Sequence, residues 1–115
     1  MRPQPDPAHQ PDPALARLLA LAERDPRRAV RFARARYGEQ PTAPLERLLL
    51  GWALLRWERI ATARPLLAAA HDALAQAGLA AEARLCRLGL LIARQLEGEG
   101  ASLQPAWEEL VAACE

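Results

Sequence analysis

Leucine and alanine recur at intervals of three and four residues through most of this chain, and proline or glycine interrupts the pattern. This spacing places apolar side chains on one face of an α-helix, whereas a strand would need an alternating pattern. Ala and Leu supply 26 and 21 of the 115 residues, while Val, Ile and Thr together supply six. Because strands favour β-branched residues, the fold is predicted to be all-α.

Proline and glycine divide the apolar pattern into about six helices. Asp-Pro pairs at 12–13 and 25–26 predict helix starts, because aspartate accepts hydrogen bonds from free N–H groups and proline suits the first helical position. Gly38 and Gly78 predict helix ends. Pro65 falls close to a predicted helix start, so we expect it to be accommodated without splitting its helix.

Residues 1–12 are rich in proline and offer almost nothing to bury, so a disordered tail is expected there. The remainder, 13–115, is long enough for one domain. Short connections predict antiparallel helices, with Phe32 and Leu96 among the residues that face the core. The predicted domain consists of three helical hairpins, at 13–37, 43–77 and 80–114.

Two parts of the chain resemble each other. A Leu-Gly pair occurs at 50–51 and again at 88–89, and an apolar residue follows three positions after each glycine. Downstream, residues 63–70 align with 106–113, with five extra residues in the second turn. Two helices approach closely only where one presents a small side chain. The small residues predicted at such contacts are Gly51, Gly89, Ala63 and Ala106.

This spacing of Leu50, Gly51, Leu54, Ala63, Leu67 and Ala70 resembles the tetratricopeptide repeat (TPR), over about 42–115. The family's aromatic residue near the start of its first helix, its turn glycine (Glu58 stands there) and its proline after the second helix are absent. The resemblance implies stacked hairpins in a right-handed solenoid, and a scaffold module for protein–protein interaction that binds a peptide or partner protein. Similar arrays lie at the N-terminus or inside larger bacterial signalling proteins, such as maltose-regulator-like activators and CHAT-type proteases.

The resemblance also implies a partner-binding surface, because the first helix of each TPR hairpin lines the concave face. Carried over to this chain, the surface would hold Leu48, Trp52, Arg56, Leu90 and Arg94. A tryptophan beside an arginine would suit peptide recognition, since such residues dominate binding energy when they lose contact with water. Trp52 could instead belong to the core.

Arginines cluster around the second predicted helix, with spacings of three, four and seven residues. The members of this basic patch are Arg24, Arg27, Arg28, Arg31 and Arg34. One interpretation is a solvated face. The other interpretation is a binding site, and it leads to an alternative function: a free-standing dimeric helical protein with an Arg-rich site for nucleic acid or an acidic partner. The net charge of +1 argues against nucleic acid.

No pattern indicates catalysis, a cofactor or a metal site. His71 has no nucleophile or acid at a local spacing that would make it a base, and a long-range pair with Cys86 lacks an activating signal. Cys86 and Cys114 are too few for a disulfide framework or a zinc site. We therefore expect a protein that is not an enzyme, with no cofactor.

No apolar run approaches the ~20 residues that span a bilayer, and no signal peptide is evident. A cytoplasmic protein without membrane contact is expected. The last predicted helix carries Trp107, Leu110 and Val111, which would suit packing against a further helix. Self-association through this open C-terminal helix is one expected consequence.

Overall fold

The computed structural model describes residues 13–98 and 104–114, and every regular element within these ranges is an α-helix. The predicted all-α class is confirmed, whereas the predicted tail at 1–12 lies outside the described residues. The helices are α1 (Pro13–Arg24), α2 (Pro26–Tyr37), α3 (Pro44–Arg56), α4 (Ile60–Gln76), α5 (Ala80–Leu96) and α6 (Gln104–Cys114).

Helices begin and break where proline and aspartate predict. The Asp25 side chain accepts a hydrogen bond from the N–H of Arg28 at 3.2 Å, and Pro26 is the first residue of α2. This cap ends α1 and starts α2 within one residue. Pro65 lies in the second turn of α4, which continues unbroken to Gln76, so the expectation that its helix accommodates it is confirmed.

The turns after α3 and α4 share one backbone geometry although their sequences differ. In each turn, two successive N–H groups donate back to carbonyl oxygens of the preceding helix at 2.8–3.1 Å. This motif needs one residue with positive φ, which is Gly78 (79°) after α4 and Glu58 (62°) after α3. A side chain at positive φ costs roughly 1–2 kcal/mol, so the missing turn glycine at Glu58 leaves a strained position.

Replacing Glu58 with glycine is expected to raise the free energy of unfolding by about 1 kcal/mol, because the strain at positive φ disappears. Urea denaturation followed by circular dichroism measures this change. The matched control is Gly78→Ala in the equivalent turn, which should lower the free energy of unfolding by a similar amount. A loss of stability in Glu58→Gly would contradict this account of the turn.

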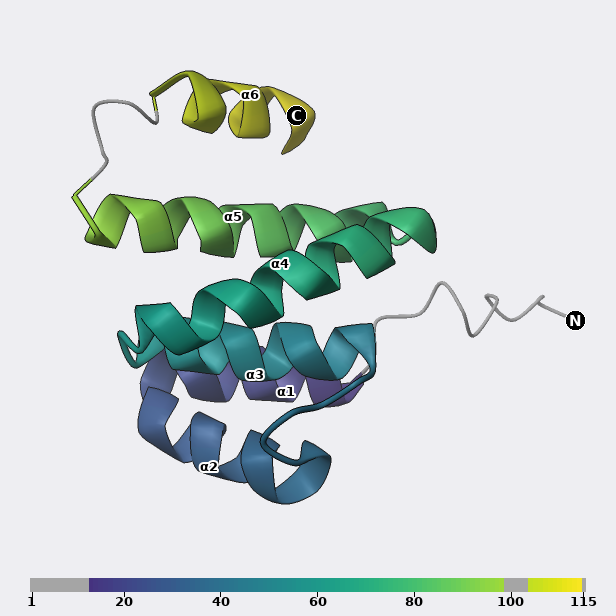
Figure 1. Cartoon of the computed structure of the whole chain (residues 1–115), viewed down its shortest axis with the longest axis vertical. Helices are drawn as coiled ribbons and strands as arrows, with labels where there is room; N and C mark the ends of the chain where they lie inside the picture. Colours follow the sequence, from purple (N-terminus) through teal and green to yellow (C-terminus); the bar gives the residue numbers. More distant parts are fainter. Residues whose placement is uncertain (1–12, 99–103, 115) are drawn as a thin grey trace, which may run out of the picture.

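Each helix packs against the next along the chain, and α3 also packs against α1 and α5. Among the described residues, no helix packs against one that is more than two places away. The helices therefore form a stack with α2 at one end and α6 at the other, while α1 lies behind α3 in this view (Figure 1). Because α3 has neighbours on several sides, residues 48–55 are buried without interruption.

Leu67 of α4 is fully buried between two glycines of neighbouring helices. A Cβ atom on Gly51 of α3 would lie 3.0 Å from Cγ of Leu67, and one on Gly89 of α5 would lie 3.0 Å from Cδ1. Ala63 and Ala70, one turn to either side of Leu67, are also fully buried. The prediction that Gly51 lies at a close helix contact is confirmed, Ala63 is buried, and the shared neighbour Leu67 joins three helices.

The second half of the predicted repeat packs differently. The nearest side chains to a Cβ on Gly89 belong to Leu67 and Trp52, so this glycine faces α4 and α3 rather than α6. Helix α6 instead rests on a small separate cluster, in which Leu110 packs against Leu91. The prediction that Gly89 lies at a close helix contact is therefore confirmed, but the helices that approach it are α4 and α3, and among the described helices α6 packs against α5 alone.

Two apolar residues expected in the core lie at the surface. Phe32 of α2 is 50% exposed and Leu96 of α5 is 48% exposed. On α2 the inward face is formed by Ala29, Val30 and Ala33, which leaves Phe32 on the flank of the helix. Leu96 is the last residue of α5.

Candidate functional site

The residues predicted to form a concave binding surface do not form an open one. Leu48 is fully buried and Trp52 is 7% exposed, and both belong to the main hydrophobic core. Leu90 and Arg94 are partly buried, and Leu90 packs against that core. Because Leu48 and Trp52 already contact other helices, this structure leaves their side chains little surface for a partner, and the prediction of an exposed surface at these two positions is corrected.

Trp52 and Arg56 share an acidic partner within the chain. The indole N–H of Trp52 donates to one carboxylate oxygen of Glu23 at 3.4 Å, and Arg56 pairs with the other at 3.0 Å. Glu23 belongs to α1, so these two bonds tie α1 to α3. Arg56 is exposed, but its charge is directed to α1 in this structure.

The predicted basic patch is divided between two surfaces. Arg27, Arg28 and Arg31 are exposed and line a shallow hollow together with Asp25 and Phe32. Arg24, the last residue of α1, lines a different cleft. Arg34 is partly buried, and its Nε atom is buried without a hydrogen-bond partner. The structure thus separates Arg24 and Arg34 from the other three.

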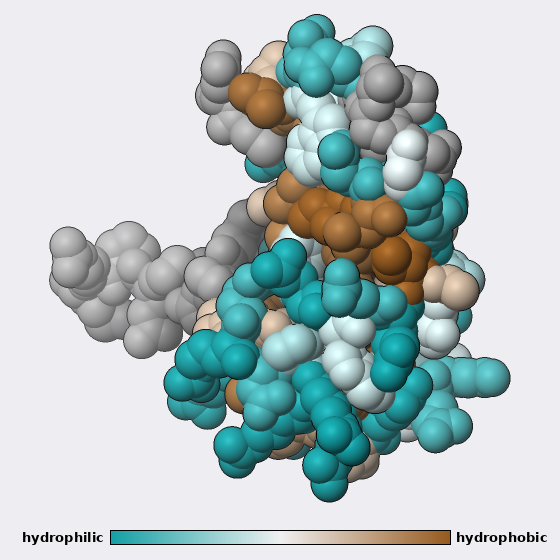
Figure 2. All heavy atoms as spheres, turned by 90° about the vertical axis from the view of Figure 1, so that its left-hand side faces the viewer, coloured by the Kyte–Doolittle hydropathy of each residue, from teal (hydrophilic) through white to brown (hydrophobic). Residues whose placement is uncertain are grey.

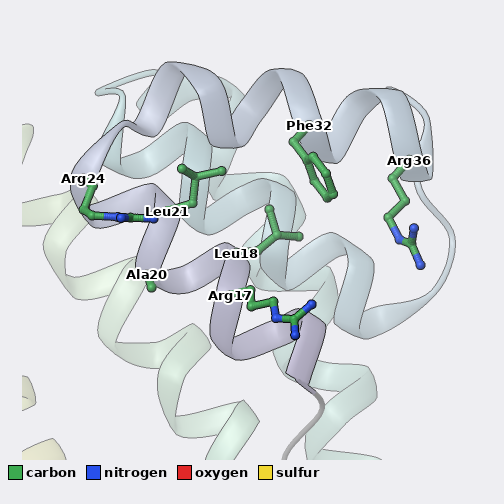
Figure 3. A pocket seen from close by; sticks show the side chains of 7 residues that line it. All are labelled: Arg17, Leu18, Ala20, Leu21, Arg24, Phe32 and Arg36. Carbon is green, nitrogen blue, oxygen red and sulfur yellow. The ribbon is translucent and has the colours of Figure 1, made fainter.

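The cleft lined by Arg24 lies between α1 and α2 and has a volume of about 550 Å³. We call it the α1/α2 cleft; Figure 3 shows its lining residues, which are Arg17, Leu18, Ala20, Leu21, Arg24, Phe32 and Arg36. The ring of Phe32 points from α2 toward Leu18 of α1, so apolar side chains form the floor (Figure 3). Arginines from both helices surround this floor.

Among the described residues, none that lines the α1/α2 cleft is acidic. Within residues 13–98 and 104–114, no ion pair joins Arg17, Arg24 or Arg36 to a carboxylate. The guanidinium of Arg36 lies 5.9 Å from the ring centre of Tyr37, which is a cation–π contact rather than neutralisation. The cleft therefore combines an apolar floor with uncompensated positive charge.

Sequence reasoning missed Arg17, Arg36 and the exposure of Phe32, although spacing held a signal. Phe32 and Arg36 are four residues apart, as Arg17 and Leu21 are on α1, so each pair occupies one helix face. Large size made Phe32 look like a core residue. The spacing of Phe32 and Arg36 places them on one face of α2, and this face forms the α2 side of the cleft.

A second cleft lies between α5 and α6, with a volume of about 470 Å³. Its walls are mainly apolar and include Leu85, Leu88 and Trp107, with Val111 at 56% exposure. On a different side of the molecule, where α5 ends, Figure 2 shows hydrophobic surface gathered at the level of α5, whereas the residues of α5 that line this cleft belong to the first half of the helix. The lining of the α5/α6 cleft includes Trp107, Leu110 and Val111, the apolar residues that the sequence assigned to an open C-terminal helix, together with Arg84.

Cys86 does not have the environment of a catalytic thiol. The side chain is fully buried in the core, and burial raises the pKa of its thiol to about 12. His71 is partly exposed, and its Nδ1 lies 3.2 Å from a carboxylate oxygen of Asp72. In the described part of the chain, His, Cys, Asp and Glu do not form a group of three or more that could hold a metal ion.

Cys86 is expected to react with a disulfide reagent at about pH 8 roughly a thousandfold more slowly in the folded protein than in the unfolded one, because its pKa rises by about three units from its ordinary value of 9.0. The measurement is release of thionitrobenzoate from Ellman's reagent in a Cys114→Ser background. Equal rates with and without denaturant would contradict the buried thiol.

The same shift predicts a dependence of stability on pH. The folded protein favours the neutral thiol, so the contribution of Cys86 is complete below about pH 9 and is lost as the pH rises toward 12. The difference in stability between the parent protein and Cys86→Ala isolates this effect from other groups. A difference that stays constant across this range would show that the pKa is not raised.

Within the described ranges, no helix has both the length and the apolar character needed to cross a membrane. In the part of the chain that the structure describes, a basic cleft lies between α1 and α2 and a mainly apolar cleft lies between α5 and α6. No protein-family model matches the chain, and no match was found among curated proteins or among solved structures.

Proposed function

We propose that this chain is a TPR-like helical-repeat module, a right-handed solenoid of stacked hairpins, that binds a peptide or partner protein. Packing that is confined to neighbouring helices supports this proposal, because stacked repeats contact only what lies next to them. A closed bundle would instead bring α1 or α2 against α5 or α6. The close approach of Gly51 to Leu67 of α4 and the complete burial of Ala63 also fit the repeat.

The observation that carries the binding function is the α1/α2 cleft. A side chain such as Phe32, half exposed beside unpaired arginines, is poorly placed for stability but well placed for a partner. Aromatic and arginine residues are enriched where proteins bind each other. The cleft volume also falls within the range of ligand sites.

Selection from a random peptide library displayed on phage, with the folded chain as bait, tests this proposal. We expect enriched peptides that bind with micromolar dissociation constants, as measured by fluorescence anisotropy. They should bind more weakly to a Phe32→Ser variant whose thermal unfolding midpoint shows that it remains folded. Failure to enrich any peptide above the level seen with the unfolded chain would contradict a peptide-binding function.

A nucleic-acid site is the second candidate, since the exposed Phe32 lies beside Arg27, Arg28 and Arg31 as well as the cleft arginines. Single-stranded nucleic acids stack bases on aromatic rings within positively charged grooves. Binding of oligothymidylate that weakens steeply with salt and is lost in Phe32→Ser would favour this candidate over the peptide.

A further inference from the structure

Positive charge is concentrated on the first hairpin. Residues 13–37 contain seven arginines and two acidic residues, a net charge of +5, so the rest of the chain carries −4 to give the total of +1. Both acidic residues are engaged elsewhere: Glu23 bonds Trp52 and Arg56, and Asp25 caps α2. The arginines of the α1/α2 cleft are therefore left for a ligand.

The apolar floor restricts what that ligand can be. Leu18 is buried and Leu21 is partly buried, while the ring of Phe32 is half exposed above them. Displacing water from this floor favours an apolar side chain, and the same loss of water strengthens ion pairs at the rim. A ligand that satisfies both parts must carry apolar groups next to negative charges.

We propose that the α1/α2 cleft binds an acidic amphipathic helix, whose apolar stripe contacts Leu18, Leu21 and Phe32 while glutamates or aspartates on its flanks pair with Arg17, Arg24 and Arg36. This inference rests on the proposed peptide-binding function and names its partner class. Arg17 and Arg24 are seven residues apart on α1, or roughly 10 Å along its axis. Two to three turns of a partner helix cover that distance.

Shape favours a peptide over a nucleic acid. The floor is formed largely by branched aliphatic side chains, which offer a base no flat surface for stacking, and Phe32 is the one aromatic ring that lines the α1/α2 cleft. Among the other aromatic residues, Trp52 is buried and Trp57 is covered by the guanidinium of Arg59, 4.3 Å from its ring centre. A strand that stacks successive bases would need several such rings in a row.

Three fluorescein-labelled probes of about 15 residues test the proposal, a length at which an isolated helix is marginally stable. The first has leucine at every third or fourth position and glutamate on both flanks. The second replaces each glutamate with glutamine, and the third replaces each leucine with alanine. Oligothymidylate of similar length is the nucleic-acid probe. Fluorescence anisotropy gives each dissociation constant at low and at physiological salt.

We expect the acidic leucine peptide to bind about tenfold more tightly than the glutamine peptide, since several rim ion pairs contribute modestly each. The alanine peptide should bind more weakly still. Phe32→Ser and Arg17→Glu should each weaken binding of the acidic peptide about tenfold. Arg84→Glu is the matched control, because it makes the same change in net charge at the other end of the stack, and it should alter binding less than twofold.

An equal loss of affinity in Arg84→Glu and Arg17→Glu would show that the peptide responds only to the net charge of the protein, and it would overturn the inference. Equal affinity for the glutamine peptide would do the same. Tighter binding of oligothymidylate, lost in Arg17→Glu, would replace the peptide with a nucleic acid. If library peptides bind with the same affinity to the parent protein, Arg17→Glu and Phe32→Ser, the peptide-binding function is supported but its assignment to the α1/α2 cleft is wrong. If no peptide binds at all, both proposals are wrong.

Discussion

Replacing Leu67 with alanine is expected to lower the free energy of unfolding by about 2–5 kcal/mol, because the change removes a fully buried side chain and leaves a cavity. The effect should lie toward the upper end of this range, since Leu67 contacts α3 at Gly51 and α5 at Gly89 as well as its own helix. Neither glycine has a side chain that could move into the space. Urea denaturation monitored by tryptophan fluorescence measures the loss.

The same substitution at Leu96 provides the control. Leu96 ends α5 with 48% of its surface exposed, so Leu96→Ala should cost less than about 1 kcal/mol. Similar losses at Leu67 and Leu96 would show that Leu67 does not hold three helices together. A loss at Leu67 that far exceeds the control would support its position at the centre of the stack.

Gly51→Val is expected to lower the free energy of unfolding by about 1–3 kcal/mol through overpacking. Even the first added carbon would lie 3.0 Å from Cγ of Leu67 and 3.2 Å from Cβ of Leu66, and valine adds two further methyl groups to this carbon. Propensity alone predicts the opposite sign, because glycine within a helix is less favourable than most residues. The sign of the change therefore separates packing from propensity.

Ala69→Val is the control for Gly51→Val, because it places valine at an exposed position of a helix; it should cost no more than about 0.7 kcal/mol. A double mutant adds a second check. Leu67→Ala frees the space beside Gly51, so Gly51→Ala should be less harmful in that background than alone, with a coupling of at least about 0.5 kcal/mol. Additive effects would mean that the two residues do not compete for the same space.

The helices were largely predictable from local chemistry. Asp25 and Pro26 fix a helix boundary through a hydrogen bond and a fixed φ, and both effects depend on residues adjacent in sequence. Pro65 was predictable for the same reason, since its tolerance depends on distance from the helix start. The close contact at Gly51 and the burial of Ala63 were also predictable, because small residues at a helix crossing leave a pattern in the sequence.

The α1/α2 cleft was harder to predict because it depends on which face of α2 turns inward. Ala29 and Ala33 admit two orientations of the helix, one burying Val30 and one burying Phe32. The larger side chain of Phe32 makes it the expected core residue. In the structure, however, α2 packs against α3 with the smaller Val30 fully buried, and Phe32 is half exposed. Periodicity within one helix cannot decide between such orientations without the shape of its neighbour.

The packing of α6 could likewise not be predicted from the local sequence. Aligning Ala106 with Ala63 predicts equivalent contacts, yet α6 rests on α5 through Leu110 and Leu91 and does not reach Gly89. Trp52 and Leu67 already fill the surroundings of that glycine. The contact is therefore decided by residues of α3 and α4, which an alignment of one hairpin with another does not consider.

Since packing in the described part of the chain is confined to near neighbours, the basic cleft at one end and the apolar cleft at the other share no direct contact. In the solenoid proposed above, small changes of angle at each interface would add up along the series and would change the separation of the two clefts. A partner long enough to occupy both would set the curvature of the molecule, and its affinity would depend on how readily the helices bend to meet it.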